Sequence, residues 1–254
     1  ALGGVSNSFN TLGADEHCIF LDNLENANLF HHKLLDALLQ LNETQERVSI
    51  GIVGAGATGV ELAAELHHVI ESVKEYGYLN IAKHHLEVHL IEASSKILPQ
   101  LPERVSARAQ AVLDKIGIRL HIGVQVKEVT HDGFITQDGD VIRAGLKVWA
   151  AGVKGPKAFE NFTKLPITSR NQIEVDTCMR VKGHQDIYAL GDCALLMQDS
   201  GRPVPPRAQA AAQMADTLFG NIVNRLQDKP EKAFVYKDYG SLVSLSRFSA
   251  VGNL

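Results

Sequence analysis

Three glycines between Val48 and Leu66, in VSIGIVGAGATGVELAAEL, have the types and spacing needed to hold a phosphate group. An apolar run over 48–53 leads into Gly54, Gly56 and Gly59, and a helical pattern of apolar residues follows at once. In this arrangement the first N–H groups and the positive dipole end of the helix face an anion. We therefore predict a dinucleotide site, because a strand, this turn and a helix are the context that the dinucleotide fingerprint requires.

Each glycine has a separate physical role in this prediction. Gly54 makes the tight turn, Gly56 lets the backbone approach a pyrophosphate, and Gly59 lets the helix pack close to the strand. The alternative is a glycine-rich turn in a βα unit that binds no ligand.

Glu92 indicates that the nucleotide is NAD and not NADP. It ends the next predicted strand, 86–91, and no arginine follows in the next few residues. A carboxylate at this position accepts hydrogen bonds from the ribose hydroxyls and repels a 2′-phosphate. The gap from Gly59 is longer than the usual one of about 20 residues, so an ordinary solvated carboxylate remains an alternative.

The surrounding pattern predicts a closed α/β domain over 46–153, Rossmann-like, with an inserted β-meander. Asp132-Gly133 and Asp138-Gly139 are turn signals between the short meander strands. The predicted helices cover 24–41 and 102–117, and the predicted strands cover 18–21, 48–53, 86–91, 118–122, 124–130, 134–136, 141–143 and 146–151. A linker over 153–171 precedes predicted strands at 179–181 and 187–190, a helix at 207–226 and strands at 234–236 and 242–248.

Composition excludes several classes of function. The net charge is −4, with no basic stripe, so we expect no nucleic-acid partner. No apolar run reaches about 18 residues, the length of a membrane span. Cys18, Cys178 and Cys193 lie far apart without a CxxC motif, so neither a redox dithiol nor a metal site is expected.

Three further motifs carry a resemblance to a known family. Val148–Val153 reads VWAAGV, Ile187–Cys193 reads IYALGDC, and Pro206–Gln213 reads PRAQAAAQ. Together with the glycine turn, this order resembles the two-dinucleotide flavoprotein reductases, and within them the type II NADH:quinone oxidoreductases. The resemblance implies FAD and NAD as cofactors, NADH and a quinone as substrates, and an FAD domain that is incomplete in this chain.

The resemblance also implies roles for individual residues. Glu61 would reach toward the contact between nicotinamide and flavin, and Gln209 and Gln213 would contact the flavin ring and a quinone carbonyl. Plain structural roles are the alternatives: a helix dipole contact for Glu61, a helix N-cap for Asp192 and an exposed helix face for the two glutamines. The further residues that the resemblance assigns to cofactor binding are Gly3, Thr58, Ala151, Gly152, Gly191, Asp192 and Ala208.

We expect residues 1–45 to be part of the FAD domain with the crossover segment, and 154–254 to be its second part with the start of a C-terminal region. The parent protein is expected on the cytoplasmic face of the inner membrane, held peripherally by a C-terminal region that is missing here, and it could be a homodimer. Two other functions stay open: a reductase for a ferredoxin-like carrier, and an NADH-binding module without catalysis.

Because the chain contains one glycine fingerprint, which belongs to the NAD domain, we predict that it binds NADH but retains little FAD. The ADP half of FAD needs a second glycine turn to meet its pyrophosphate. The measurement is the visible absorbance of the purified chain after incubation with FAD and gel filtration. Stoichiometric flavin that NADH bleaches would contradict the prediction.

Overall fold

The computed structural model describes residues 1–44, 47–75, 85–162, 164–247 and 250–253. The chain divides into two compact units, each with its own core. Unit 1 comprises Ala1–Asn7 and Val153–Tyr239, and unit 2 comprises Ser8–Gly152 and Gly240–Leu254. The sequence predicts a polar connection over 75–85 before the strand at 86–91, and residues 76–84 of it lie outside the described residues.

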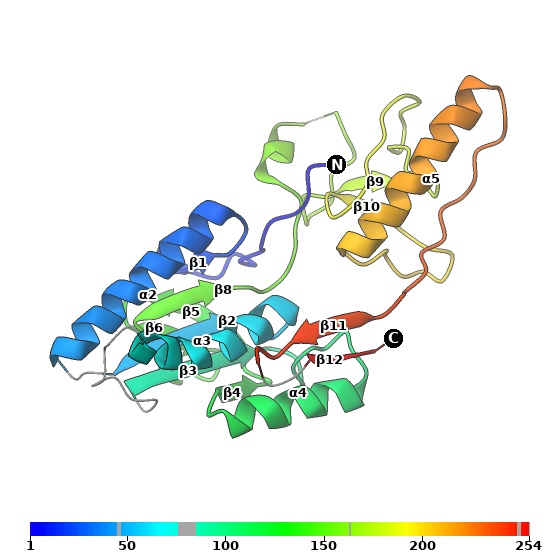
Figure 1. Cartoon of the computed structure of the whole chain (residues 1–254). Coiled ribbons are helices and arrows are strands. Elements are labelled where there is room, and N and C mark those ends of the chain that lie inside the picture. The colour runs from blue at the N-terminus through cyan, green and yellow to red at the C-terminus, as the bar shows by residue number, and fades with distance from the viewer. Residues whose placement is uncertain (45–46, 76–84, 163, 248–249, 254) are drawn as a thin grey trace. The chain divides into compact units, whose positions relative to one another are not determined.

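Unit 2 is built on a parallel sheet of five strands, shown in Figure 1. All neighbouring strands run parallel, so their carboxyl ends meet at one edge, where ligands bind in sheets of this kind. The strands follow the order β1 (Ile19–Phe20), β8 (Leu146–Trp149), β2 (Val48–Val53), β3 (Leu86–Glu92) and β4 (Arg119–Ile122). This confirms the predicted α/β fold with its parallel sheet.

The two faces of this sheet are covered by different structures. Three helices, α2 (Leu24–Thr44), α3 (Ala57–Glu75) and α4 (Glu103–Lys115), bury one face, into which Ile50 and Ile52 point. The predicted meander covers the other face, with Phe134 against the position of Gly51. It consists of the antiparallel strands β5 (Val126–Thr130), β6 (Gly133–Thr136) and β7 (Val141–Arg143), beside the short helix α1 (Ala14–His17).

The compact units have other boundaries than the domain predicted over 46–153. Helix α2 belongs to unit 2, because its buried apolar side chains pack into the helix-side core. A hairpin of β11 (Ser241–Ser244) and β12 (Ala250–Asn253) belongs to unit 2 as well, and Val243 and Val251 lie in the same core. Periodicity predicts that these segments are helix or strand, but it does not say which core they fill.

Unit 1 contains helix α5 (Ala208–Leu226), the 3-10 helix η2 (Lys157–Asn161) and two short parallel strands, β9 (Ile173–Val175) and β10 (Ala194–Leu196). The predicted strands at 179–181 and 187–190 are wrong, because these runs make only isolated bridges. Their apolar side chains are nevertheless in place, since Met179, Val181 and Ala189 lie in the core of unit 1.

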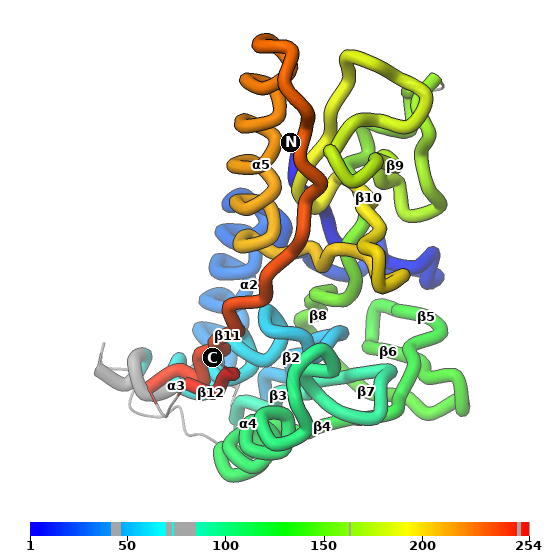
Figure 2. The backbone as a smooth tube through the Cα atoms, turned by 90° about the vertical axis from the view of Figure 1, so that its right-hand side faces the viewer, coloured from blue at the N-terminus to red at the C-terminus, as the bar shows by residue number. Residues whose placement is uncertain are grey.

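The segment over 230–239 is extended but belongs to no sheet, so the strand predicted at 234–236 is not formed. Figure 2 shows it running along α5. Asn221 is buried and binds both backbone groups of Lys232, each at 2.8 Å, in the way that a neighbouring strand would. None of the described helices combines the length and the apolar character that crossing a bilayer requires.

Two stacked histidine rings, one from β3 and one from β4, lie side by side in unit 2. His89 Nδ1 lies 2.9 Å from His121 Nε2, and the rings stack with centroids 5.2 Å apart. Burial lowers the pKa of His89, Glu87 opposes this, and the positive charges of His121 and Arg119 add to it. Burial, assisted by Arg119, also lowers the pKa of His121. Glu87 in turn contacts both His89, at 3.2 Å, and Arg119.

We therefore expect unit 2 to lose stability as the pH falls below the ordinary histidine pKa of about 6.5. Below this value the two histidines take up protons in the unfolded chain. In the folded chain they take up protons only at lower pH, because their pKa values are lowered. Between the ordinary and the lowered pKa values, acid therefore favours unfolding. The measurement is urea unfolding at pH 7.5 and at pH 5.5. From pH 7.5 to pH 5.5, the double variant His89→Gln/His121→Gln should lose less free energy of unfolding than the parent. The exposed control His131→Gln should lose as much as the parent. Equal losses in parent and double variant would contradict the assignment.

Candidate functional site

The glycine turn after β2 is closed by contacts that leave no room for side chains. Gly54 has a φ of +102°, and its N–H donates to the Ile91 carbonyl at 2.8 Å. A Cβ on Gly54 would lie 2.7 Å from the Cα of Ala151. Ala151, one of the residues that the resemblance assigns to cofactor binding, therefore lies beside the turn, and Gly152 follows it, shortly after the end of β8.

Gly59 and Gly56 differ sharply in their surroundings. A Cβ on Gly59, in the first turn of α3, would overlap the carbonyl oxygen of Gly54, so the helix can start here only if this residue is glycine. A Cβ on Gly56 would meet no atom within 4 Å. Ala57 and Thr58, the first residues of α3, are exposed. The open space at Gly56 therefore adjoins the N-terminus of a long helix, where an anion is favoured.

Glu92 at the end of β3 is fixed beside this turn. One carboxylate oxygen accepts the N–H of Ala55 at 2.7 Å and the other accepts the N–H of Ser94 at 2.8 Å. Each oxygen keeps a lone pair that can accept a ribose hydroxyl. The sequence places Glu92 at the strand end, and the structure adds that the carboxylate is already bound to the turn.

Glu61, one turn into α3, also accepts a backbone hydrogen bond. The N–H of Ser244 in β11 donates to its Oε1 at 3.0 Å. This partner could not be predicted from the sequence, because 183 residues separate the two positions and no local signal joins them.

Because the strand predicted at 187–190 is not formed, Asp192 in unit 1 does not follow a strand but lies in the turn that precedes β10. Its carbonyl accepts from Gln172 Nε2 at 2.8 Å, and burial raises the pKa of its carboxyl group. Gly191 has a φ of +76°, and a Cβ there would lie 3.4 Å from the Cβ of Ala211 in α5. Asp192 is therefore held next to the first turns of α5.

The start of α5 carries no side-chain cap. Arg207 occupies the N-cap position without a capping hydrogen bond from its side chain, and Ala208 is the first helical residue. A cavity of about 10 Å³ separates this helix start from Asp192. It has room for about one water molecule, so it holds no ligand by itself, but the helix start can donate N–H groups to an electron-rich ligand beside it.

The chain start joins the same region through Gly4 more closely than through the predicted Gly3. A Cβ on Gly4 would lie 2.8 Å from Val153 Cγ1 and 3.0 Å from the Cβ of Asp192, whereas one on Gly3 would meet nothing within 4 Å. The N–H of Val5 donates to the carbonyl of Lys154, and the N–H of Lys154 donates to the carbonyl of Val5, each at 2.9 Å. Gly4 is thus a residue that the sequence analysis missed, because only this pairing brings it to Asp192.

Gln209 and Gln213 lie on one face of α5, as their spacing of four predicts, and both bind the extended segment beside the helix. Gln213 accepts the N–H of Lys237 at 3.0 Å and donates to its carbonyl at 2.9 Å. Gln209 accepts the N–H of Tyr239 at 3.0 Å. In this structure the two amides therefore hold backbone, which the resemblance did not indicate.

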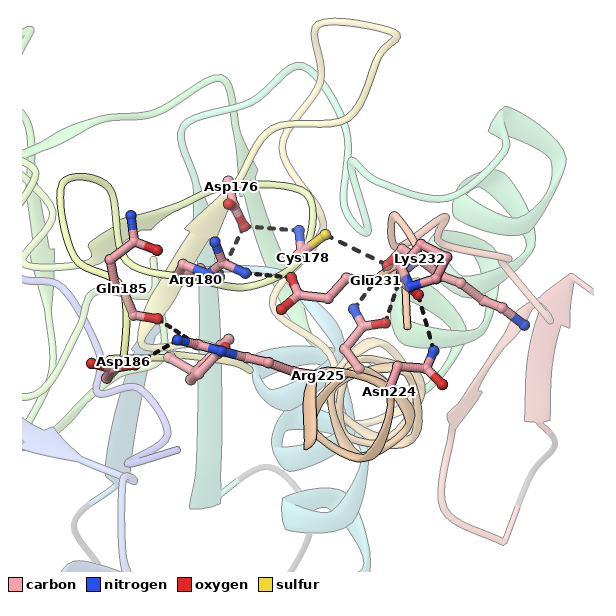
Figure 3. A network of polar contacts seen from close by, with 12 residues as sticks. Asp176, Cys178, Arg180, Gln185, Asp186, Asn224, Arg225, Glu231 and Lys232 are labelled. Atoms are coloured by element: carbon pink, nitrogen blue, oxygen red, sulfur yellow. Dashed lines mark hydrogen bonds and ion pairs between the residues drawn. The ribbon is translucent and has the colours of Figure 1, made fainter. Parts of the chain in front are cut away.

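A polar network fixes the other end of α5 to the loop that carries Tyr188, shown in Figure 3. Arg225 donates to the Tyr188 hydroxyl at 2.7 Å, to Asp186 at 2.7 Å and to the Gln185 carbonyl at 2.6 Å. Arg180, over the Tyr188 ring, pairs with Glu231 at 2.5 Å. Within the residues that the structure describes, no group of three or more acidic, histidine or cysteine side chains is arranged to hold a metal ion.

The chain matches known proteins over its whole length. A family model described as pyridine nucleotide-disulphide oxidoreductase matches residues 1–215. A type II NADH:quinone oxidoreductase of Haemophilus influenzae is 42% identical over 100% of this chain and 61% of its own length. An internal alternative NAD(P)H-ubiquinone oxidoreductase A1, mitochondrial, of Solanum tuberosum is 31% identical over 100% of this chain and 54% of its own length. The chain therefore spans less than two thirds of these relatives.

A solved structure has a closely similar fold. It is an NDH2 from Plasmodium falciparum in complex with NADH, with a TM-score of 0.87, 22% identity, and coverage of 99% of this chain and 68% of that one.

The open space at Gly56 predicts a variant that loses the ligand but keeps the fold. Gly56→Val should weaken NADH binding by at least about tenfold, because the side chain fills the space that a pyrophosphate needs, while stability stays within about 0.5 kcal/mol as at ordinary surface sites. Fluorescence titration measures the binding, and urea unfolding measures the stability.

Gly59→Val is the contrasting variant. It should lower the free energy of unfolding by about 1–3 kcal/mol, since its side chain would overlap Gly54. Parental NADH affinity in Gly56→Val, or equal stability losses in both variants, would show that the site is misplaced.

Proposed function

The chain belongs to the pyridine nucleotide-disulphide oxidoreductase family. We propose that it binds NADH and is part of a flavoprotein that passes the electrons of NADH to a quinone. The observation that carries this proposal is the glycine turn, open at Gly56 and closed at Gly54 and Gly59, with Glu92 fixed beside it. The names of the curated relatives supply the quinone as acceptor. Since the chain spans 61% of the Haemophilus relative, the proposed activity is that of the full-length gene product.

NADH would bind along the carboxyl edge of the sheet in unit 2. The first N–H groups of α3, beginning at Ala57, would donate to the pyrophosphate, with Thr58 within the same turn. Glu92 would accept the ribose hydroxyls, and Ala151 and Gly152 would border the nicotinamide portion. Glu61 would orient the nicotinamide, and its carboxylate is held for this by the Ser244 N–H.

Unit 1 fits the ribityl and ring end of FAD. Asp192 would accept a ribityl hydroxyl, while Gly3, Gly4 and Gly191 keep side chains out of the approach. The uncapped start of α5 at Ala208 would donate N–H groups to the ring. When bound, FAD would supply chemistry that side chains lack, by accepting a hydride and passing on two electrons.

Gln209 and Gln213 would contact the flavin ring and a quinone carbonyl. Because both amides hold residues 237–239, we extend this proposal to include that segment as a wall of the quinone site. A quinone dissolves in lipid, so we also propose that the full-length protein binds the membrane surface peripherally and on its cytoplasmic face. A homodimer is compatible with this arrangement.

The test is NADH oxidation by the full-length protein with a short-chain quinone, with a ferredoxin, or with no acceptor. We expect rapid turnover only with the quinone. Glu61→Gln should lower that turnover at least about tenfold, because a misoriented nicotinamide reacts more slowly, with little change in NADH affinity. Glu65→Gln, one turn further along the same helix and exposed, is the matched control and should retain parental turnover.

Faster turnover with the ferredoxin than with the quinone would assign the protein to the carrier reductases. NADH binding without turnover with any acceptor would support a non-catalytic module. A Glu61→Gln variant with parental turnover would remove Glu61 from the catalytic residues.

A further inference from the structure

The loop after β3 is tied to the glycine turn at two points. The Ser94 N–H binds Glu92, which in turn accepts the N–H of Ala55, and the Leu98 N–H donates to the Ala55 carbonyl at 2.7 Å. A third bond, from Ser106 Oγ to the Ile97 carbonyl at 2.6 Å, anchors the loop to α4. The loop is therefore a fixed wall of the proposed ribose site.

Lys96 lies midway between these two ties, two residues from each. Its ammonium group donates to the Leu101 carbonyl at 2.9 Å and pairs with Glu103 Oε2 at 3.1 Å. The Lys96 side chain is 24% exposed and that of Glu103 is 80% exposed. Glu103 is the first residue of α4, where a carboxylate also suits the helix dipole.

We propose that Lys96 is a latent 2′-phosphate-binding residue, and that Glu103 and the Leu101 carbonyl hold its charge away from the ribose. The inference rests on the proposed function, in which Glu92 takes the ribose hydroxyls. A 2′-phosphate needs a cation beside it, and lysine binds phosphate as a point charge. NADH selectivity then has two determinants, repulsion by Glu92 and sequestration of Lys96.

The competing explanation is that Lys96 and Glu103 form a surface ion pair that only supports the start of α4. Such exposed pairs contribute little to stability, so removal of Glu103 should leave the fold intact under either explanation. The two explanations differ in NADPH binding, because only the latent site gains affinity when Lys96 is released.

The experiment measures dissociation constants of NADH and NADPH for this chain by fluorescence titration. Glu92→Gln alone should raise NADPH affinity modestly. Adding Glu103→Ala should raise it by about a further tenfold, the contribution of one hydrogen bond to a charged group. Adding Lys96→Gln to that double variant should abolish the gain. The control replaces Glu103→Ala by Asp114→Ala, which removes an exposed carboxylate from the last turn of the same helix. Combined with Glu92→Gln, it should give no further gain in NADPH affinity.

Three outcomes would overturn the inference: no gain from Glu103→Ala, an equal gain from Asp114→Ala, or a gain that survives Lys96→Gln. If the unmodified chain binds NADH, these outcomes reject only the role of Lys96. If it binds neither nucleotide, the proposed function fails and the inference fails with it.

Discussion

The arrangement of unit 2 depends on a place where backbones meet without side chains between them. Gly54 lies against Ala151, which follows β8, and Gly59 of α3 lies against the Gly54 carbonyl. These contacts bring the ends of two parallel strands and the start of a long helix to one point. A methyl group on Gly54 would collide with the backbone at Ala151, and one on Gly59 would push α3 away from the strand. In the second case the N–H groups at the helix start would no longer face the same space as Gly56. The proposed ligand site is therefore a consequence of close packing.

The two carboxylates that we propose for this site are held in the same way. Glu92 is bound by the N–H groups of Ala55 and Ser94, and Glu61 by that of Ser244. Both carboxylates are thus held by backbone N–H groups. These donors remain when the side chains of the supporting segments are replaced. The hairpin of β11 and β12 is consequently more than a cover for α3 and α4, because it supplies one of these donors.

Features with a local signal could be predicted from the sequence, and features that depend on distant partners could not. The glycine turn, the Asp-Gly turns of the meander and the strand ending in Glu92 are each encoded within a few residues. The strands expected at 179–181 and 187–190 are not formed, because an apolar run becomes a strand only where a second strand pairs with it. The contacts of Gly4, Ser244 and Lys96, from which their proposed roles follow, are made only in the fold, and those of Gly4 and Ser244 are with residues far away in the sequence.

The segment beside α5 shows how two different periodicities can be matched. Four helical residues rise about 6 Å, and two extended residues rise about 6.6 Å, so Gln209 and Gln213 meet Tyr239 and Lys237 in step. Asn221 binds Lys232 beyond this repeat, where eight helical residues are matched by five extended ones. Surface segments ordinarily tolerate insertions and deletions during evolution. Here a single added or lost residue in the segment would shift every later amide out of register, so this stretch should keep its length among relatives even where its residue types drift.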